Sequence, residues 1–188
     1  MIKAIIWDIG GVLGEYIGNC NFWKNVKEEA RELRDKFGSS KMSAEEFIEK
    51  GSKLLNMNKE DFLKGYKDYT AIRLNEPAIK IYKKIKIDKY ILSDVSPLFR
   101  ADRAEFFKGV CELAKETFWS TDIKMRKSSI EAFKFVLKKI NRKPEEVLFI
   151  DDVKELTDRA KSLGINTIHY QNPEQLKLEL KDFGIKIK

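Results

Sequence analysis

The amino-acid sequence predicts an α/β protein with a doubly wound parallel sheet, and three observations lead to this fold class. Short apolar runs recur along the chain, at residues 1–13, 89–93 and 146–152. Each run contains or ends in a carboxylate or a hydroxyl. Segments with helical periodicity separate the runs, and strands that alternate with helices join as parallel neighbours through right-handed crossovers. The polar strand ends should therefore meet at one edge of the sheet, where open α/β sheets bind ligands.

The first run, residues 1–13, has the composition of a central strand. It is apolar on both faces and rich in β-branched and aromatic residues until Asp8 interrupts it. Gly10 and Gly11 follow, and glycine allows a sharp turn and the close approach of another group. The same residues could form a plain turn, but the polar groups at the other strand ends favour a reactive loop. We therefore expect chemistry at Asp8.

Residues 14–75 have the pattern of a helical insertion after this first strand. Helical periodicity predicts three helices there, over residues 22–38, from the capping box at Ser43 onward, and over 59–70. Their apolar stripes are expected to form a core of their own. The α/β core then comprises residues 1–13 and 76–188.

The rest of the chain alternates between helices and strands. The expected helices cover 76–86, 97–115, a segment opened by the capping box Ser128 to Glu131, 154–163, and a closing helix after Asn172 and Pro173. The expected strands cover 90–93, 116–120, 147–150 and 166–170. This alternation supports the parallel sheet.

Size and charge are those of a globular protein with a single core. The chain has 188 residues, of which 43% are hydrophobic and 36% are charged. Its net charge is +7, but the lysines are mixed with glutamates along the helices, so we expect no nucleic-acid partner. The positive potential would instead draw anionic substrates toward the protein.

The sequence also suggests a compartment. Cys20 and Cys111 lack metal or disulfide spacing, which indicates reduced thiols in a cytoplasmic protein. We expect no signal peptide, because residues 1–13 are already strand and loop. No apolar run approaches the roughly 20 residues needed to span a bilayer, so no membrane partner is expected.

Four stretches together resemble the motifs of the haloacid dehalogenase (HAD) superfamily. They are WDIGGVL at 7–13, ILSD at 91–94, RK at 126–127 and PEEVLFIDD at 144–152. The last is highly typical of the family, and the fit extends from Ile2 to about Tyr170. The resemblance implies a HAD-like, Rossmannoid core, and it makes residues 14–75 a small α-helical cap that closes over the active site.

The carboxylates of Asp8, Asp151 and Asp152 predict a metal site. Carboxylates that cluster at neutral pH repel one another unless a cation neutralises them, and oxygen ligands suit Mg²⁺. By resemblance, the ion is held by Asp8, by the backbone carbonyl of Gly10, and by Asp152 or Asp151. A histidine cluster is excluded within one chain, because His169 is the only histidine and is expected to be structural.

The resemblance also assigns catalytic roles. Asp8 is the expected nucleophile, which forms an aspartyl-phosphate that water then hydrolyses. Lys127 is expected to neutralise charge on the phosphoryl group, and the Ser93 hydroxyl to orient it. The substrate-binding candidates are Gly11, Glu15, Tyr16, Trp23 and Asp94. For Trp23, packing inside the cap is an equal alternative.

The chain departs from the family pattern at three positions. Many family phosphatases carry a second aspartate two residues after the nucleophile, which protonates the leaving group, whereas this chain has Gly10. Turnover is therefore expected to be slow, limited to good leaving groups, or rescued by a cap residue or a water. Glycine does occur there in members that resemble sugar-1-phosphate phosphatases. Ser128 stands in place of a common proline, and Leu156 in place of a common asparagine.

These features predict a Mg²⁺-dependent phosphatase that acts on a small phosphorylated metabolite, with a sugar phosphate preferred. One alternative is a binding or regulatory protein of the same fold that turns over little or no substrate. A 2-haloacid dehalogenase ranks lower, because that chemistry needs no metal-binding acid pair. The chain is expected to act as a monomer or a homodimer.

Overall fold

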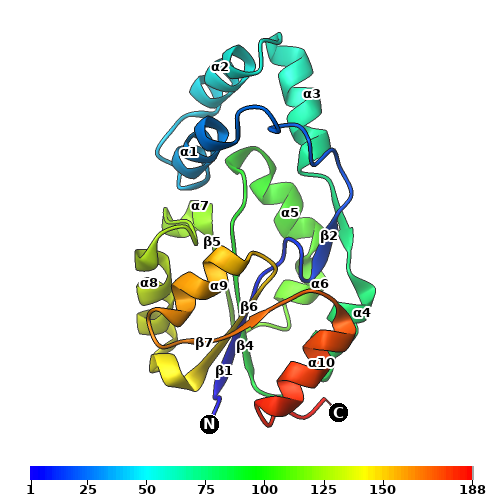
Figure 1. Ribbon diagram of the computed structural model, residues 1–188, viewed down its shortest axis with the longest axis vertical. Helices are drawn as coiled ribbons and strands as arrows, with labels where there is room; N and C mark the ends of the chain where they lie inside the picture. Colours follow the sequence, from blue (N-terminus) through cyan, green and yellow to red (C-terminus); the bar gives the residue numbers. More distant parts are fainter. Residues whose placement is uncertain (188) are drawn as a thin grey trace.

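The central sheet has five parallel strands in the order β5-β4-β1-β6-β7, which confirms the predicted parallel sheet (Figure 1). The computed structural model describes residues 1–187, and position 188 of the predicted core lies outside the described residues. The strands are β1 Ala4–Trp7, β4 Asp88–Ser93, β5 Glu116–Trp119, β6 Val147–Asp151 and β7 Asn166–His169. β1 lies in the middle of the sheet, as its two apolar faces predict.

The two faces of β1 enter different hydrophobic clusters. Successive side chains of a strand point to opposite faces, so Ile5 and Trp7 join one cluster while Ala4 and Ile6 join the other. Helices α4 Glu76–Lys84 and α10 Pro173–Asp182 cover the first face, and α8 Ile130–Ile140 and α9 Lys154–Lys161 cover the second (Figure 1). Helices on both faces make the sheet doubly wound.

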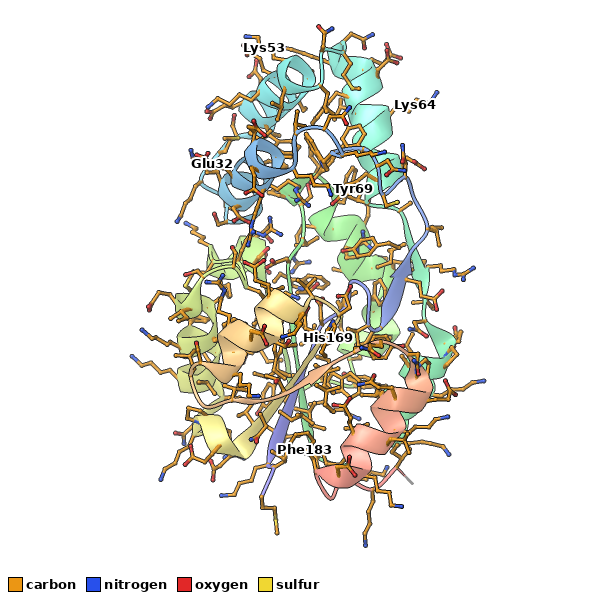
Figure 2. The ribbon with its side chains drawn as sticks, in the orientation of Figure 1. Glu32, Lys53, Lys64, Tyr69, His169 and Phe183 are labelled. Atoms are coloured by element: carbon orange, nitrogen blue, oxygen red, sulfur yellow. The ribbon has the colours of Figure 1, made fainter. Side chains whose placement is uncertain are left out.

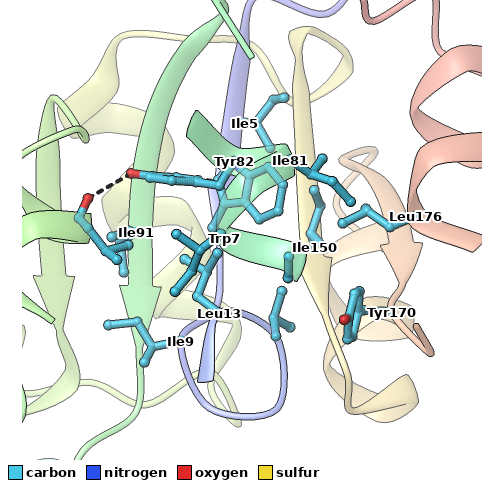
Figure 3. Packing of buried hydrophobic residues seen from close by; sticks show 14 of the residues in the cluster. Ile5, Trp7, Ile9, Leu13, Ile81, Tyr82, Ile91, Ile150, Tyr170 and Leu176 are labelled. Carbon is cyan, nitrogen blue, oxygen red and sulfur yellow. Dashed lines mark hydrogen bonds between the residues drawn. The ribbon is translucent and has the colours of Figure 1, made fainter. Parts of the chain in front are cut away.

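Packing around Trp7 holds the end of the central strand in place (Figure 3). The Trp7 ring meets Tyr82 edge-on with centroids 5.2 Å apart, and the Tyr82 hydroxyl donates a hydrogen bond of 3.2 Å to the Val110 carbonyl. The next backbone N–H, that of Asp8, donates to the Ile150 carbonyl at 3.0 Å. The backbone from which the Asp8 side chain projects is therefore fixed by packing and by the sheet.

The segment from 14 to 75 begins and ends in a two-stranded antiparallel ribbon. Strand β2 Gly14–Tyr16 pairs with β3 Ile72–Leu74, and between them lie α1 Lys27–Gly38, α2 Ala44–Leu54 and α3 Lys59–Tyr69. We call residues 14–75 the helical insertion. Its helices lie beyond the carboxyl ends of the sheet strands (Figure 1). Its buried side chains form a separate cluster, made of Trp23, Ala30, Leu33, Phe37, Phe47, Phe62 and Tyr66.

Ion pairs connect the helical insertion to the α/β core. Arg126, which precedes α8, lies 3.0 Å from Asp35 on α1. Arg31, also on α1, lies 2.5 Å from Glu155 on α9. Helix α1 is thus held over the carboxyl ends of the strands from two sides.

Two predicted helices differ in extent. The helix expected over 22–38 begins only at Lys27. Residues 22–26 form turns instead, and these turns pack the side chains of Phe22 and Trp23 into the hydrophobic cluster of the insertion. The helix expected over 97–115 is broken into a 3₁₀ turn Pro97–Phe99, α5 Arg100–Phe106 and α6 Lys108–Cys111. The break falls at Phe107, whose side chain is fully buried in the core.

The helix expected to open at Ser128 instead has Ser129 as its N-cap. The Ser129 hydroxyl accepts a hydrogen bond of 3.3 Å from the Glu131 N–H. A turn from the Arg126 carbonyl to the Ser129 N–H, 2.9 Å, delays the helix by one residue. The short elements β2, β3 and α7 Ser120–Ile123 were not expected.

Within residues 1–187, every helix is too short or too polar to cross a membrane.

Candidate active site

Three neighbouring strands bring their carboxyl ends to one place. Asp8 follows β1, Ser93 ends β4 and Asp151 ends β6, and β1 lies between the other two strands. All three side chains are buried. The prediction that polar strand ends meet at one edge is therefore confirmed for these residues.

Lys127 lies between two of the carboxylates. Its Nζ is 2.8 Å from Asp8 Oδ2 and 2.6 Å from Asp151 Oδ2, and the residue is only 2% exposed. Burial by itself lowers the pKa of Lys127, but the charges of Asp151 and Asp8 outweigh it and raise the pKa above its usual value. The side chain therefore stays a buried ammonium group at neutral pH.

The acidic groups outnumber this ammonium. Ligand oxygens of Asp8, Asp151 and Asp152 lie within 4.8 Å of one another. Burial is the main reason that the pKa of Asp8 is raised, and the two neighbouring carboxylates add to it. Burial and the charge of Asp151 likewise raise the pKa of Asp152 to about 6. Three carboxylates facing a single ammonium form a site that a divalent cation would stabilise.

The oxygens of the acid pair have different partners. Both carboxylate oxygens of Asp151 are engaged, Oδ2 by Lys127 and Oδ1 by the Val153 N–H at 2.9 Å. The Asp152 carboxylate lies against Gly11, where a Cβ would overlap it and where φ is +83°. Gly11 thus needs to be glycine for the close approach and for its backbone conformation. His169 Nε2 lies 2.9 Å from the Asp152 carbonyl oxygen, so this histidine contacts the loop that follows β6.

Asp94 accepts hydrogen bonds from the loop that contains Arg126 and Lys127. Its Oδ1 accepts a hydrogen bond of 3.1 Å from the Lys127 N–H, and its Oδ2 accepts one of 3.1 Å from Arg126 Nε. The carboxylate is therefore already occupied by protein donors. Asp94 borders the cavity described next, but the contacts that it makes position Lys127.

A cavity of about 300 Å³ separates the strand ends from the helical insertion. Gly10, Ser93 and Asp94 line its floor. Arg34 and the tyrosines Tyr66 and Tyr69 line it from the insertion. Tyr69, labelled in Figure 2, lies on the side of the insertion that faces the α/β core. Gly10 and Ser93, at the ends of the strands, and residues of the insertion therefore border one cavity.

Tyr16 brings its hydroxyl to Gly10. A Cβ built at Gly10 would overlap the Tyr16 hydroxyl and lie 2.9 Å from the ring Cζ. The residue is 57% exposed and borders the cavity, and its hydroxyl end lies against Gly10. Desolvation of that end, and then the charge of Asp8, raise the pKa of Tyr16, so the hydroxyl stays protonated. The side chain fills the space that a residue larger than glycine would need at position 10.

Two other substrate candidates lie elsewhere. Glu15 pairs with Arg73 on the ribbon at 2.7 Å and does not border the cavity. Trp23 is 4% exposed and packs edge-on against Phe22, with centroids 4.9 Å apart, inside the aromatic cluster of the insertion. The structure thus places Trp23 as the packing alternative describes.

Sequence reasoning missed two arginines of the cavity, Arg34 and Arg103. Arg34 lies on the charged face of an amphipathic helix, and such charges are usually solvated. Arg103 lies on α5, inside a segment that was expected to be one long helix. No local pattern distinguishes either residue from a surface arginine.

The fold is that of several solved structures of haloacid dehalogenase (HAD) proteins. The structure is similar to a HAD-family enzyme of Bacteroides thetaiotaomicron in complex with magnesium and inorganic phosphate, with a TM-score of 0.66, 22% identity, and coverage of 91% of this chain and 95% of that one. It is similar to a predicted HAD-like family hydrolase of Porphyromonas gingivalis, with a TM-score of 0.72, 19% identity and coverage of 97% and 98%. The predicted resemblance is confirmed at the level of the fold.

A third similar structure is the L-2-haloacid dehalogenase of Xanthobacter autotrophicus with chloropropionic acid covalently bound. Its TM-score is 0.63, at 15% identity, over 99% of this chain and 85% of that one. No protein-family model matches the sequence, and no curated protein matches it at a significant level. The likeness therefore lies in the three-dimensional structure.

Proposed function

We propose that this protein is a Mg²⁺-dependent phosphatase that hydrolyses a small phosphomonoester through an aspartyl-phosphate on Asp8. One observation carries the proposal: the Asp8 carboxylate, at the end of the central strand, shares a buried cluster with Lys127, Asp151 and Asp152. The HAD-family enzyme of Bacteroides thetaiotaomicron, crystallised with magnesium and phosphate, supports the same chemistry.

The residues fit a divalent cation. Asp8 and Asp152 would supply carboxylate oxygens, and the family resemblance adds the Gly10 carbonyl as a third oxygen ligand. Asp152 is the better ligand of the acid pair, because both oxygens of Asp151 already accept hydrogen bonds. When bound, Mg²⁺ neutralises part of the charge on the phosphoryl oxygens.

The side chains of this protein carry the displacement itself. A carboxylate oxygen of Asp8 attacks phosphorus, and the bond from phosphorus to the leaving-group oxygen breaks, so that the departing oxygen takes a proton from water. Water then attacks the phosphorus of the aspartyl-phosphate, which releases inorganic phosphate and restores Asp8. Lys127 faces the negative charge that develops on the phosphoryl oxygens, and the Ser93 hydroxyl orients them.

The Tyr16 hydroxyl takes the place of the acid that is absent at Gly10. It occupies the volume into which a side chain at position 10 would extend, and it stays protonated at neutral pH. From there it donates a hydrogen bond to the leaving-group oxygen. Help of this kind matters most for a poor leaving group, because such a group carries the most negative charge as it departs.

Replacing Tyr16 should therefore affect substrates unequally. We expect Tyr16→Phe to lower turnover of an alkyl phosphate by about 10²-fold and that of an aryl phosphate by much less. Gly10→Asp alone should not help, because the new side chain overlaps Tyr16. The double variant Gly10→Asp/Tyr16→Ala should recover turnover of the alkyl phosphate. If Tyr16→Phe lowered turnover of both substrates equally, Tyr16 would have no role in assisting the leaving group.

The proposed function is tested by phosphate release from sugar phosphates, nucleotides and an aryl phosphate, measured with Mg²⁺ and with a chelator. Asp8→Asn protein, prepared in the same way, is the blank. We expect release above the blank that requires Mg²⁺. Halide released from 2-chloropropionate without metal would favour a dehalogenase instead. Mg²⁺ binding with no release from any substrate would favour a binding protein.

A further inference from the structure

We infer that the cavity contains a second anion-binding site, formed by Arg34 and Arg103, and that the substrate is a small phosphomonoester with a second anionic group. The inference deepens the proposed phosphatase and rests on it for the position of the reacting phosphoryl group. It concerns the end of the substrate that lies away from Asp8, beneath the helical insertion.

Arg103 supplies the first observation. Its Nη2 donates a hydrogen bond of 2.8 Å to the Thr70 carbonyl, whereas its Nη1 is buried with no hydrogen-bond partner. Burial lowers the pKa of Arg103, and among residues 1–187 no carboxylate forms an ion pair with it. A desolvated guanidinium without a counter-ion is costly. An anion in the cavity would remove that cost.

Arg34 supplies the second observation. Its Nη1 donates to the Tyr69 hydroxyl at 2.7 Å, and its Nε donates to the Ala30 carbonyl at 3.2 Å. Both acceptors are neutral, and no ion pair of Arg34 is present in the described part of the chain. A guanidinium group has five N–H donors, so most of its hydrogen-bonding capacity remains free.

The two arginines border the same cavity and bind neighbouring residues. Their partners, Tyr69 and Thr70, are consecutive residues at the end of α3, and both arginines border the same cavity. Arg34 comes from the helical insertion and Arg103 from the α/β core. The site is therefore complete only where the insertion meets the core.

Arg126 provides the contrast within the same cavity. It pairs with Asp94 at 3.1 Å and with Asp35 at 3.0 Å, so its charge is already balanced. Asp94 is the only carboxylate that borders the cavity in the described residues, and Arg126 occupies it. The positive charges of Arg34 and Arg103 are thus left for a ligand.

The chemistry of the site limits the ligand. Guanidinium groups bind carboxylate and phosphate by paired N–H donors, and they bind a neutral hydroxyl much less strongly. A space of about 300 Å³ admits a metabolite of a few carbons that reaches from Ser93 to the arginines. The second anionic group is therefore a carboxylate or a second phosphoryl group.

Matched pairs of substrates test the site. The first pair is 3-phosphoglycerate and glycerol 3-phosphate, and the second is fructose 1,6-bisphosphate and fructose 6-phosphate. We expect kcat/KM to favour the more anionic member of one pair by about 10²-fold in the wild type. The preferred pair identifies the second group as carboxylate or phosphoryl.

Variants then locate the preference. Arg34→Gln and Arg103→Gln should each reduce the ratio about 10-fold, and Arg103→Lys, which keeps the charge, should reduce it less. A ratio within one variant cancels any general loss of folded protein. Arg142→Gln is the matched control, because Arg142 pairs with Asp88 at the start of β4, at the opposite edge of the sheet. Its ratio should equal that of the wild type.

A binding measurement tests the second anion-binding site independently of phosphatase activity. Calorimetric titration of each pair into the Asp8→Asn variant with Mg²⁺ measures the preference without turnover. A preference that is lost with Arg34 or Arg103 supports the site even if no phosphate is released. Equal binding and equal kcat/KM within both pairs overturn it, and so does a ratio in the arginine variants that matches the Arg142→Gln control.

Discussion

The Asp8→Asn variant is expected to release phosphate from the preferred substrate at least about 10⁴-fold more slowly than the wild type. An amide has the shape of the carboxylate but cannot attack phosphorus, so the covalent step is lost. The variant should fold normally, because the pKa of Asp8 is raised and a neutral side chain relieves the repulsion from Asp151 and Asp152. Phosphate release and thermal unfolding without metal measure the two effects.

A trapped intermediate makes this result specific. Wild-type protein quenched in acid during turnover should gain the mass of one phosphoryl group, and Asp8→Asn protein should not. Asp158→Asn is the control, because Asp158 is an exposed acid that pairs with Lys154 on α9. Turnover by purified Asp8→Asn close to that of Asp158→Asn would contradict the proposed nucleophile.

The Lys127→Ala variant is expected to lower turnover by about 10³-fold, because a preorganised positive charge beside the phosphoryl group is removed. It should also lower the free energy of unfolding by about 3 kcal/mol, since it leaves buried carboxylates without their ammonium partner. Mg²⁺ should restore part of that stability. Turnover and urea unfolding, each with and without Mg²⁺, measure both effects.

The control for this variant is Lys134→Ala. Lys134 is an exposed lysine on α8 that pairs with Glu131, so both turnover and stability should stay near the wild-type values. If Lys127→Ala retained wild-type turnover, Lys127 would have no role in the reaction. If it lost turnover but no stability, the buried pairs to Asp8 and Asp151 would be weaker than their geometry implies.

The reactive strand ends were predictable because each depends on local chemistry. Asp8, Ser93 and Asp151 each lie at the end of an apolar run. Neighbouring parallel strands place such ends together at one edge of the sheet. Lys127 was identified by its family motif, since a lone lysine in a loop carries no signal of burial. The structure adds that Asp94 positions this lysine through its backbone N–H.

Boundaries were less predictable where distant packing decides them. The break at Phe107 arises because a buried aromatic side chain competes with continued helix geometry. Ser128 and Ser129 are equally good caps by composition, and the turn from Arg126 selects the second. Trp23 could have faced either the cavity or the helices, and its contacts with Phe22 and Phe62 show that it packs with the helices.

The sequence by itself determined the sheet, the helical insertion and the cluster at Asp8, because periodicity and strand-end chemistry are local properties of a chain. Only the tertiary structure decided what surrounds that cluster. Arg34 and Arg103 are separated widely in sequence, and they share a cavity only because both bind residues at the end of α3. Tyr16 covers Gly10 only because β2 turns back on the loop. Contacts of this kind depend on side chains from different elements, and no pattern along the chain records them.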